Sequence, residues 1–170
     1  MNQSSPRILE SPEGDFYLRQ LQMEDADEFY TVYEANRPYL SSFDQDFTTL
    51  FPNITAVTKE LSPAVAVDRT HFGIMHEGEF AGGVGFYRRQ PGVAELFYWI
   101  DQRHTGQGLA SRAGSLVTHN AFDTLHLKEV RAITYEGNVV SQRVAQKMGF
   151  TLIRKVYDEL HFALRAEEVA

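Results

Sequence analysis

The segment 93–122 constrains the fold of this 170-residue chain more than any other part of it. Residues 93–100 alternate in a pattern that predicts a strand, and Gly106 and Gly108, one residue apart, predict a tight bend. An amphipathic helix is expected next, over 109–122, with these apolar residues on one face: Leu109, Ala113, Leu116, Val117 and Ala121. The first turn of such a helix has unpaired N–H groups at its positive end, which suits a phosphate. A plain strand-to-helix turn is the alternative.

The glycine pair can be compared with three known phosphate-binding sequence patterns, and only one of them fits. A Walker loop needs Gly-x-x-x-x-Gly-Lys-Ser/Thr, and the chain has no such string. A Rossmann fingerprint needs a third glycine and an acid at the end of the next strand. Here Ser111 takes the glycine position, and Glu129 precedes the next expected strand instead of following it. The remaining pattern is a coenzyme A pyrophosphate site.

The other periodic segments predict helices and strands in mixed layers. Strands are expected near residues 16–21, 70–75, 80–87, 93–100, 130–135, 150–157 and 160–164. Helices are expected after the acidic cluster 24–28, over 55–61 and 109–122, and from an N-cap at Asn138. Pro38 is expected to stop the first helix. The order indicates an α+β fold in mixed α/β layers, with residues 1–14 as a loose lead-in and 15–170 as a single domain.

Composition excludes several classes of protein. The chain has no cysteine, which rules out disulfides, thiolate zinc sites and a cysteine nucleophile. Its net charge of −7 disfavours nucleic acid and favours cationic acceptors such as amines. The six histidines show no metal-ligand spacing, so no metal is expected. The chain also lacks a long apolar run and a signal-like start, so we expect a cytoplasmic protein without a membrane partner.

Three motifs resemble one family. Residues 103–110, Arg-His-Thr-Gly-Gln-Gly-Leu-Ala, resemble the R/Q-x-x-G-x-G/A signature of the GNAT acetyltransferase superfamily. Residues 138–150 resemble its second signature, which begins Asn-x-x-Ser and ends Lys-x-Gly-Phe. Residues 94–100, Ala-Glu-Leu-Phe-Tyr-Trp-Ile, resemble a strand of the Rim-type branch, which acetylates ribosomal-protein N-termini.

The resemblance implies a central, mostly antiparallel sheet flanked by helices, in which two parallel strands splay apart. Acetyl-CoA, the expected co-substrate, would lie between the strands 93–100 and 130–135. The residues implied to contact it are Tyr98, Trp99, Ile100, Arg103, His104, Thr105, Gly106, Gln107, Gly108, Leu109, Ala110, Asn138 and Ser141.

The resemblance identifies the catalytic groups less fully than the cofactor contacts, because the usual proton donor is missing. Many members carry a proton-donating Tyr four residues after the position of Ser141, where this chain has Ala145. Ser141 is the nearest substitute, or a first-turn residue that bonds backbone or cofactor. Glu95 shares a strand face with Phe97 and Trp99 and is the expected general base, or else an ordinary glutamate paired with a nearby Arg.

The resulting hypothesis is an N-acetyltransferase. It would move the acetyl group of acetyl-CoA to a primary amine, either a protein N-terminus or a small molecule, by direct transfer in a ternary complex. The alternative is a non-catalytic module that binds or senses acyl-CoA. Either is compatible with a homodimer.

Overall fold

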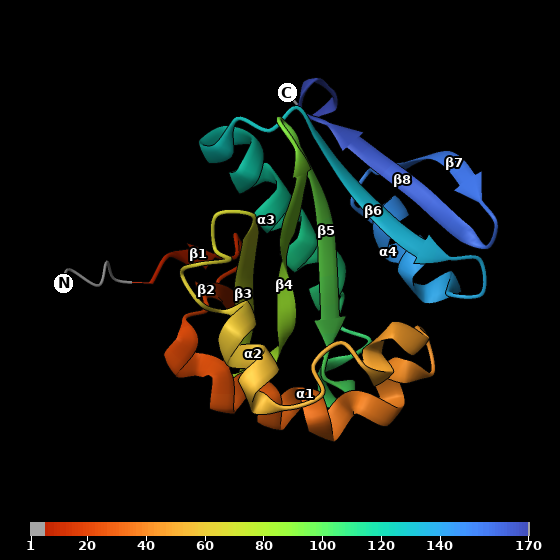
Figure 1. Ribbon diagram of the computed structural model, residues 1–170. Coiled ribbons are helices and arrows are strands. Elements are labelled where there is room, and N and C mark those ends of the chain that lie inside the picture. The colour runs from red at the N-terminus through yellow and green to blue at the C-terminus, as the bar shows by residue number, and fades with distance from the viewer. Residues whose placement is uncertain (1–5, 170) are drawn as a thin grey trace.

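Eight strands form one sheet in the computed structural model, which describes residues 6–169 (Figure 1). The order across the sheet is β1-β2-β3-β4-β5-β6-β8-β7. The bounds are β1 Ile8–Glu10, β2 Phe16–Gln20, β3 Arg69–His76, β4 Glu79–Gln90, β5 Val93–Ile100, β6 Glu129–Tyr135, β7 Thr151–Val156 and β8 Glu159–Arg165. This agrees with the expected α+β class and with a mostly antiparallel sheet.

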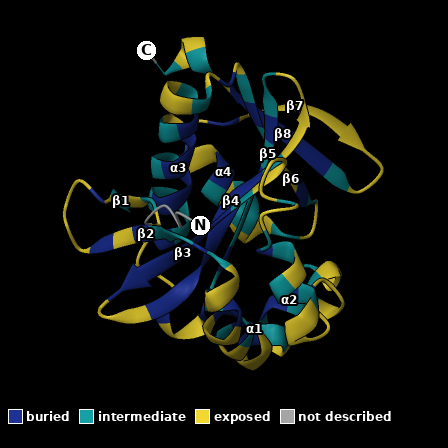
Figure 2. Ribbon diagram, turned by 60° about the vertical axis from the view of Figure 1, so that its left-hand side comes forward, coloured by how far each residue is buried: buried dark blue, intermediate teal, exposed yellow. Residues whose placement is uncertain are grey.

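Helices cover both faces of the sheet. They are α1 Ala26–Ser41, α2 Ile54–Glu60, α3 Leu109–Leu125 and α4 Val139–Lys147, with 3-10 turns η1 Met23–Asp25, η2 Gln45–Thr48, η3 Gln102–His104 and η4 Ala166–Glu168. One buried cluster joins α3 and α4 to one face of the sheet, and a second joins α1 and α2 to the other. The central strands are buried, whereas β7 is exposed along its length (Figure 2). Within residues 6–169, no helix combines the length and the apolar character needed to cross a membrane.

The parallel pair β5–β6 separates, as the resemblance implied. Its pairing covers Val93 with Glu129, Ala94 with Val130 and Glu95 with Arg131, and goes no further. Both strands nevertheless stay paired on their outer sides, β5 with β4 as far as Ile100 and β6 with β8 as far as Tyr135. The two strands therefore diverge beyond Glu95 and leave facing backbone edges unpaired (Figure 1).

Glycines of β4 make room for two aromatic rings of β5. A Cβ at Gly83 would lie 2.5 Å from Nε1 of Trp99, and one at Gly85 would lie 2.7 Å from the ring of Phe97. The rings of Phe97 and Trp99 thus lie over β4. A side chain at either glycine would displace one of these rings.

The first helix is longer than the sequence predicts. It continues through Pro38 to Ser41, so the expectation that Pro38 ends it is wrong. Proline removes one N–H donor and frees the carbonyl of Glu34, but both residues are exposed and water can bond that carbonyl. Leu40 is buried, and its packing favours the last turn.

The lead-in is also more ordered than predicted. Residues Ile8–Glu10 form β1, which pairs antiparallel with β2 and places Leu9 opposite Leu18. Leu9 packs against the larger buried cluster. A strand this short has too few alternations to be seen in the sequence. Residues 1–5 of the predicted lead-in lie outside the described part of the chain.

Candidate active site

A cavity of about 690 Å³ lies where β5 and β6 diverge. On one side its walls come from residues 104–111 and from the first two turns of α4. On the other side they come from the segment 39–51, which follows and includes the end of α1. The cavity therefore reaches the elements on both faces of the sheet through the gap between the strands.

The glycine bend presents a run of unpaired amides. Gly106 and Gly108 have φ values of +78° and +72°, in the left-handed region that favours glycine. The first helical amide to bond is that of Arg112, which donates to the carbonyl of Gly108 at 3.1 Å. Between residues 6 and 169, no hydrogen-bond acceptor pairs with the N–H groups of 106–111. A Cβ at Gly106 would have no atom within 4 Å, so the bend is open to a ligand.

Three of the residues implied to contact the cofactor use their backbone amides internally. The N–H of Arg103 donates to Oδ1 of Asp101 at 3.0 Å, and that of His104 donates to the Asp101 carbonyl at 2.9 Å. The N–H of Thr105 donates to the Gln102 carbonyl at 3.4 Å. The free series of amides therefore begins at Gly106.

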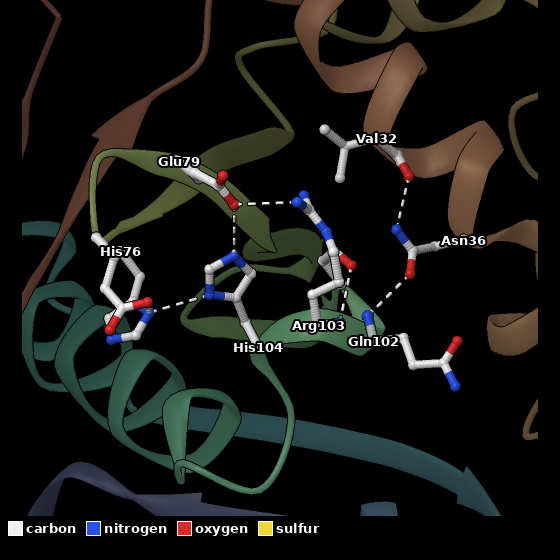
Figure 3. A network of polar contacts seen from close by, with 9 residues as sticks. Val32, Asn36, His76, Glu79, Gln102, Arg103 and His104 are labelled. Atoms are coloured by element: carbon white, nitrogen blue, oxygen red, sulfur yellow. Dashed lines mark hydrogen bonds and ion pairs between the residues drawn. The ribbon is translucent and has the colours of Figure 1, made fainter.

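A polar network fixes the bend against the rest of the molecule (Figure 3). Oδ1 of Asn36 on α1 accepts the N–H of Gln102 at 2.8 Å. His104 is 4% exposed, and its Nε2 lies 3.1 Å from a carboxylate oxygen of Glu79. A hydrogen bond of 3.1 Å joins Nδ1 of His104 to Nδ1 of His76, so one of these two rings carries its proton there. His104 lines the cavity but acts mainly as an anchor for the bend.

This network also contains a group that sequence spacing did not reveal. The fold brings ligand atoms of His76, Glu77 and His104 within 4.8 Å of one another. The two histidines lie 28 positions apart, which hides the cluster from any short motif. Their facing nitrogens already bond each other, and Glu77 is exposed. We therefore assign the histidine pair to the support of the bend.

On the α4 side, Asn138 and Ser141 lie together as the second motif implied. Asn138 caps α4, because its Oδ1 accepts the N–H of Ser141 at 3.0 Å. Oγ of Ser141 lies 2.7 Å from the phenolic oxygen of Tyr98. Burial raises the pKa of Tyr98 to about 12, although the bond with Ser141 lowers it somewhat. The position of the usual family Tyr is occupied by Ala145, which is 1% exposed. Because alanine has no hydroxyl, this position offers no proton donor.

Glu95 lines the cavity, but as half of an ion pair. Nε of Arg89 donates to Oε2 of Glu95 at 2.8 Å. This is the pairing that the sequence left open as the ordinary alternative. Trp99 and Leu109, both predicted cofactor contacts, have side chains that are 4% and 2% exposed and belong to the buried clusters. What they can offer a ligand is mainly backbone.

The wall made by residues 39–51 was not foreseen. Arg37 holds it, because its guanidinium donates to the carbonyls of Phe47 at 3.2 Å, Thr48 at 2.9 Å and Phe51 at 2.6 Å. Asp44 and Asp46 lie on this wall, and neither forms an ion pair within residues 6–169. Burial raises the pKa of Asp44. The Tyr135 hydroxyl at the end of β6 donates to Asp46 at 3.2 Å and links the wall to the sheet.

Comparisons with known proteins agree with this geometry. Residues 15–151 match the acetyltransferase (GNAT) domain family. A probable N-acetyltransferase of Bacillus subtilis (strain 168), YjcK, is 27% identical over 143 residues, 79% of each chain. A ribosomal-protein-serine acetyltransferase of Escherichia coli (strain K12) is 34% identical over 83 residues, 48% of this chain and 46% of that protein.

The fold is shared with a solved Rim-type structure. RimL, a ribosomal L7/L12 alpha-N-protein acetyltransferase in complex with coenzyme A, gives a TM-score of 0.84 at 16% identity. The match covers 95% of this chain and 99% of that one. The family match spans most of the sequence, and the splayed strands carry the two signature segments at their open end. The chain therefore belongs to the GNAT acetyltransferase family, with Rim-type relatives, and is an acetyl-CoA-dependent acetyltransferase.

Proposed function

We propose that the protein transfers the acetyl group of acetyl-CoA to a cationic primary amine, in a ternary complex that holds both substrates at once. The observation that carries this proposal is the single cavity between β5 and β6, which is lined by unpaired amides at one end and by carboxylates and aromatic rings at the other. One end suits a diphosphate and the other suits an ammonium group.

The cofactor half rests on the bend and α4. The N–H groups of residues 106–111 can bind the pyrophosphate at the positive end of α3. Arg143 and Lys147 line the same side and add positive charge. The backbone of 98–100, unpaired toward β6, can bond the pantetheine arm as an added strand, and an N–H there can polarise the thioester carbonyl.

The acceptor half rests on the wall 39–51. Asp44 and Asp46 attract a cation, while Phe43 and Phe47 offer apolar surface beside it. One relative named above is described as a ribosomal-protein-serine acetyltransferase, and RimL as an alpha-N-protein acetyltransferase, which acts on an α-amine. An α-amine with a pKa of about 7.7–8.0 loses its proton at pH 7 for about 1 kcal/mol, whereas a lysine amine at about 10.4 requires about 4–5 kcal/mol. An α-amine therefore needs only a weak base.

The chemistry is a direct displacement. The neutral amine nitrogen attacks the thioester carbonyl, the C–S bond breaks, and its electron pair leaves with sulfur. The absence of cysteine from the sequence favours this route over a thioester intermediate on the protein. Glu95 is our candidate to accept the amine proton, directly or through water, from its position on the cavity wall.

The test is release of free thiol from acetyl-CoA with a panel of amines, confirmed by mass spectrometry of the acetylated product. The panel contains short peptides with free N-termini, the same peptides with blocked N-termini and one internal lysine, and small mono- and diamines. We expect turnover with free α-amines or small cationic amines. Thermal stabilisation by coenzyme A without turnover on any amine of the panel would overturn the proposed acceptor class.

A further inference from the structure

Tyr98 connects β5 to α4 across the open end of the parallel pair. Its side chain leaves β5 on the same face as the buried Ala94 and Leu96, opposite to Glu95. Its phenolic oxygen lies 2.7 Å from Oγ of Ser141 and donates to the Ser141 carbonyl at 3.2 Å. Both residues line the cavity, so Tyr98 holds the Ser141 hydroxyl at the cavity wall.

The protons of this pair allow two arrangements. A carbonyl oxygen only accepts, so when the phenolic proton points to the Ser141 carbonyl, the Ser141 hydroxyl can donate to the phenolic oxygen. When the phenolic proton turns to Oγ, the proton of Ser141 is free to point into the cavity. Rotation of two hydroxyls converts one arrangement into the other. The backbone of Ser141 stays fixed meanwhile, because Asn138 holds its N–H.

We propose that Tyr98 is a positioning residue that turns the Ser141 hydroxyl toward the departing thiolate, and that Ser141 stabilises this sulfur by donating a hydrogen bond while keeping its proton. This inference rests on the proposed transfer reaction. When the C–S bond breaks, the electron pair and negative charge go to sulfur, and the hydroxyl dipole meets that charge. The proton lost by the amine goes to the base or to water, and the thiolate is protonated after release.

The ordering of proton affinities favours donation over full transfer. The ordinary pKa of a thiol is about 8.5. Burial raises the pKa of Tyr98 to about 12, well above that value, so moving its proton through Ser141 to the thiolate would be strongly unfavourable. A serine alkoxide would be more basic still. The pair thus replaces the missing tyrosine at Ala145 by hydrogen bonding and not by acid catalysis.

The inference is tested with Ser141→Ala, Tyr98→Phe and the double variant, using the full chain and the best amine of the panel. Hydrogen bonds to charged groups predict that Ser141→Ala lowers kcat by about 10- to 100-fold, with the KM for acetyl-CoA changed by less than about twofold. Tyr98→Phe should lower kcat by about 3- to 10-fold, and should have no further effect once Ser141 is alanine. Tyr17→Phe, on β2, is the matched control and should keep wild-type kcat.

The pH dependence tests whether the Tyr98–Ser141 pair gains or loses a proton in the working pH range. Since Ser141 keeps its proton, the ratio of wild-type to Ser141→Ala kcat should stay constant between about pH 6.5 and 9.5. A ratio that changes about tenfold over this range would overturn the donor role. If the loss of kcat in the double variant equals the product of the two single losses, Tyr98 does not act through Ser141. Full activity of Ser141→Ala beside an active wild type overturns the inference alone, whereas a wild type without turnover overturns the proposed function and the inference with it.

Discussion

At the scale of single residues, Gly106 meets two requirements of the bend: a positive φ and open space beside the unpaired amides. Its φ of +78° strains any other residue, and the space beside it is open. Gly106→Asp adds that strain and also places a carboxylate beside the unpaired amides. We expect coenzyme A affinity to fall at least about 100-fold, because two anions would compete for one site.

The control is Gly92→Asp in the turn before β5, at the opposite end of that strand from the bend, whose glycine has a φ of +76° and where an added Cβ meets only the Lys128 side chain, at 3.5 Å or more. It reproduces the backbone strain away from the bend and should leave the affinity within about twofold, as measured by titration calorimetry. Equal affinities for the two variants and the wild type would remove the pyrophosphate from this bend.

Glu95 carries the second prediction at this scale. It is the only carboxylate of β5, and Glu95→Gln keeps its size while removing its ability to accept a proton. If it is the base, the rise of kcat/KM with pH that we expect for the wild type should be flattened in this variant. Arg89→Gln, which removes only its partner, should preserve that rise. An unaltered profile for Glu95→Gln would exclude it as the base.

At the scale of elements, the acceptor wall depends on Arg37. Its guanidinium fork satisfies three carbonyls of the segment 47–51, which a lysine with one ammonium group cannot do in the same geometry. We expect Arg37→Lys to raise the KM for the amine by about tenfold while the affinity for coenzyme A stays unchanged. Arg154→Lys on the exposed strand β7 is the control. Loss of coenzyme A affinity in Arg37→Lys would show that the wall does not act separately from the bend.

The same wall shows where the sequence stops being informative. The strand expected over 93–100 and the helix start at Leu109 are observed at those residues, because their patterns are local. The wall is set by contacts such as Tyr135 with Asp46, which are 89 positions apart. Periodicity carries no signal for them. For the same reason the sequence could propose Glu95 as a base but could not identify Arg89 as its partner.

At the scale of the whole molecule, one buried acid, Asp101, links the bend to the central sheet. Asp101 is 2% exposed at the end of β5, and its N–H donates to the Ala81 carbonyl of β4. Burial alone would raise the pKa of Asp101, but hydrogen bonds from Arg103, from its side chain and its N–H, hold the pKa below its ordinary value. The ionised form is therefore stabilised by folding.

The sign of this linkage fixes the expected pH dependence. An acid with a lowered pKa in the folded state stabilises the protein above its ordinary pKa, and this contribution disappears as the pH falls through the lowered value. Asp101→Asn has no such proton to bind. We expect the wild type to melt at a higher temperature than this variant at pH 7, and the difference to shrink steadily below about pH 4.

Comparison with the variant isolates Asp101 from the other acids. Glu60 and Glu129 also have lowered pKa values, from partners elsewhere in the fold, and their contributions are common to both proteins. Only the difference between the two melting curves therefore reports on Asp101. Because Asp101 accepts the N–H of Arg103, which directly precedes the bend, Asp101→Asn should also weaken coenzyme A binding at pH 7. A constant difference in melting temperature from pH 7 to about pH 3 would mean that folding does not lower the pKa of this carboxyl.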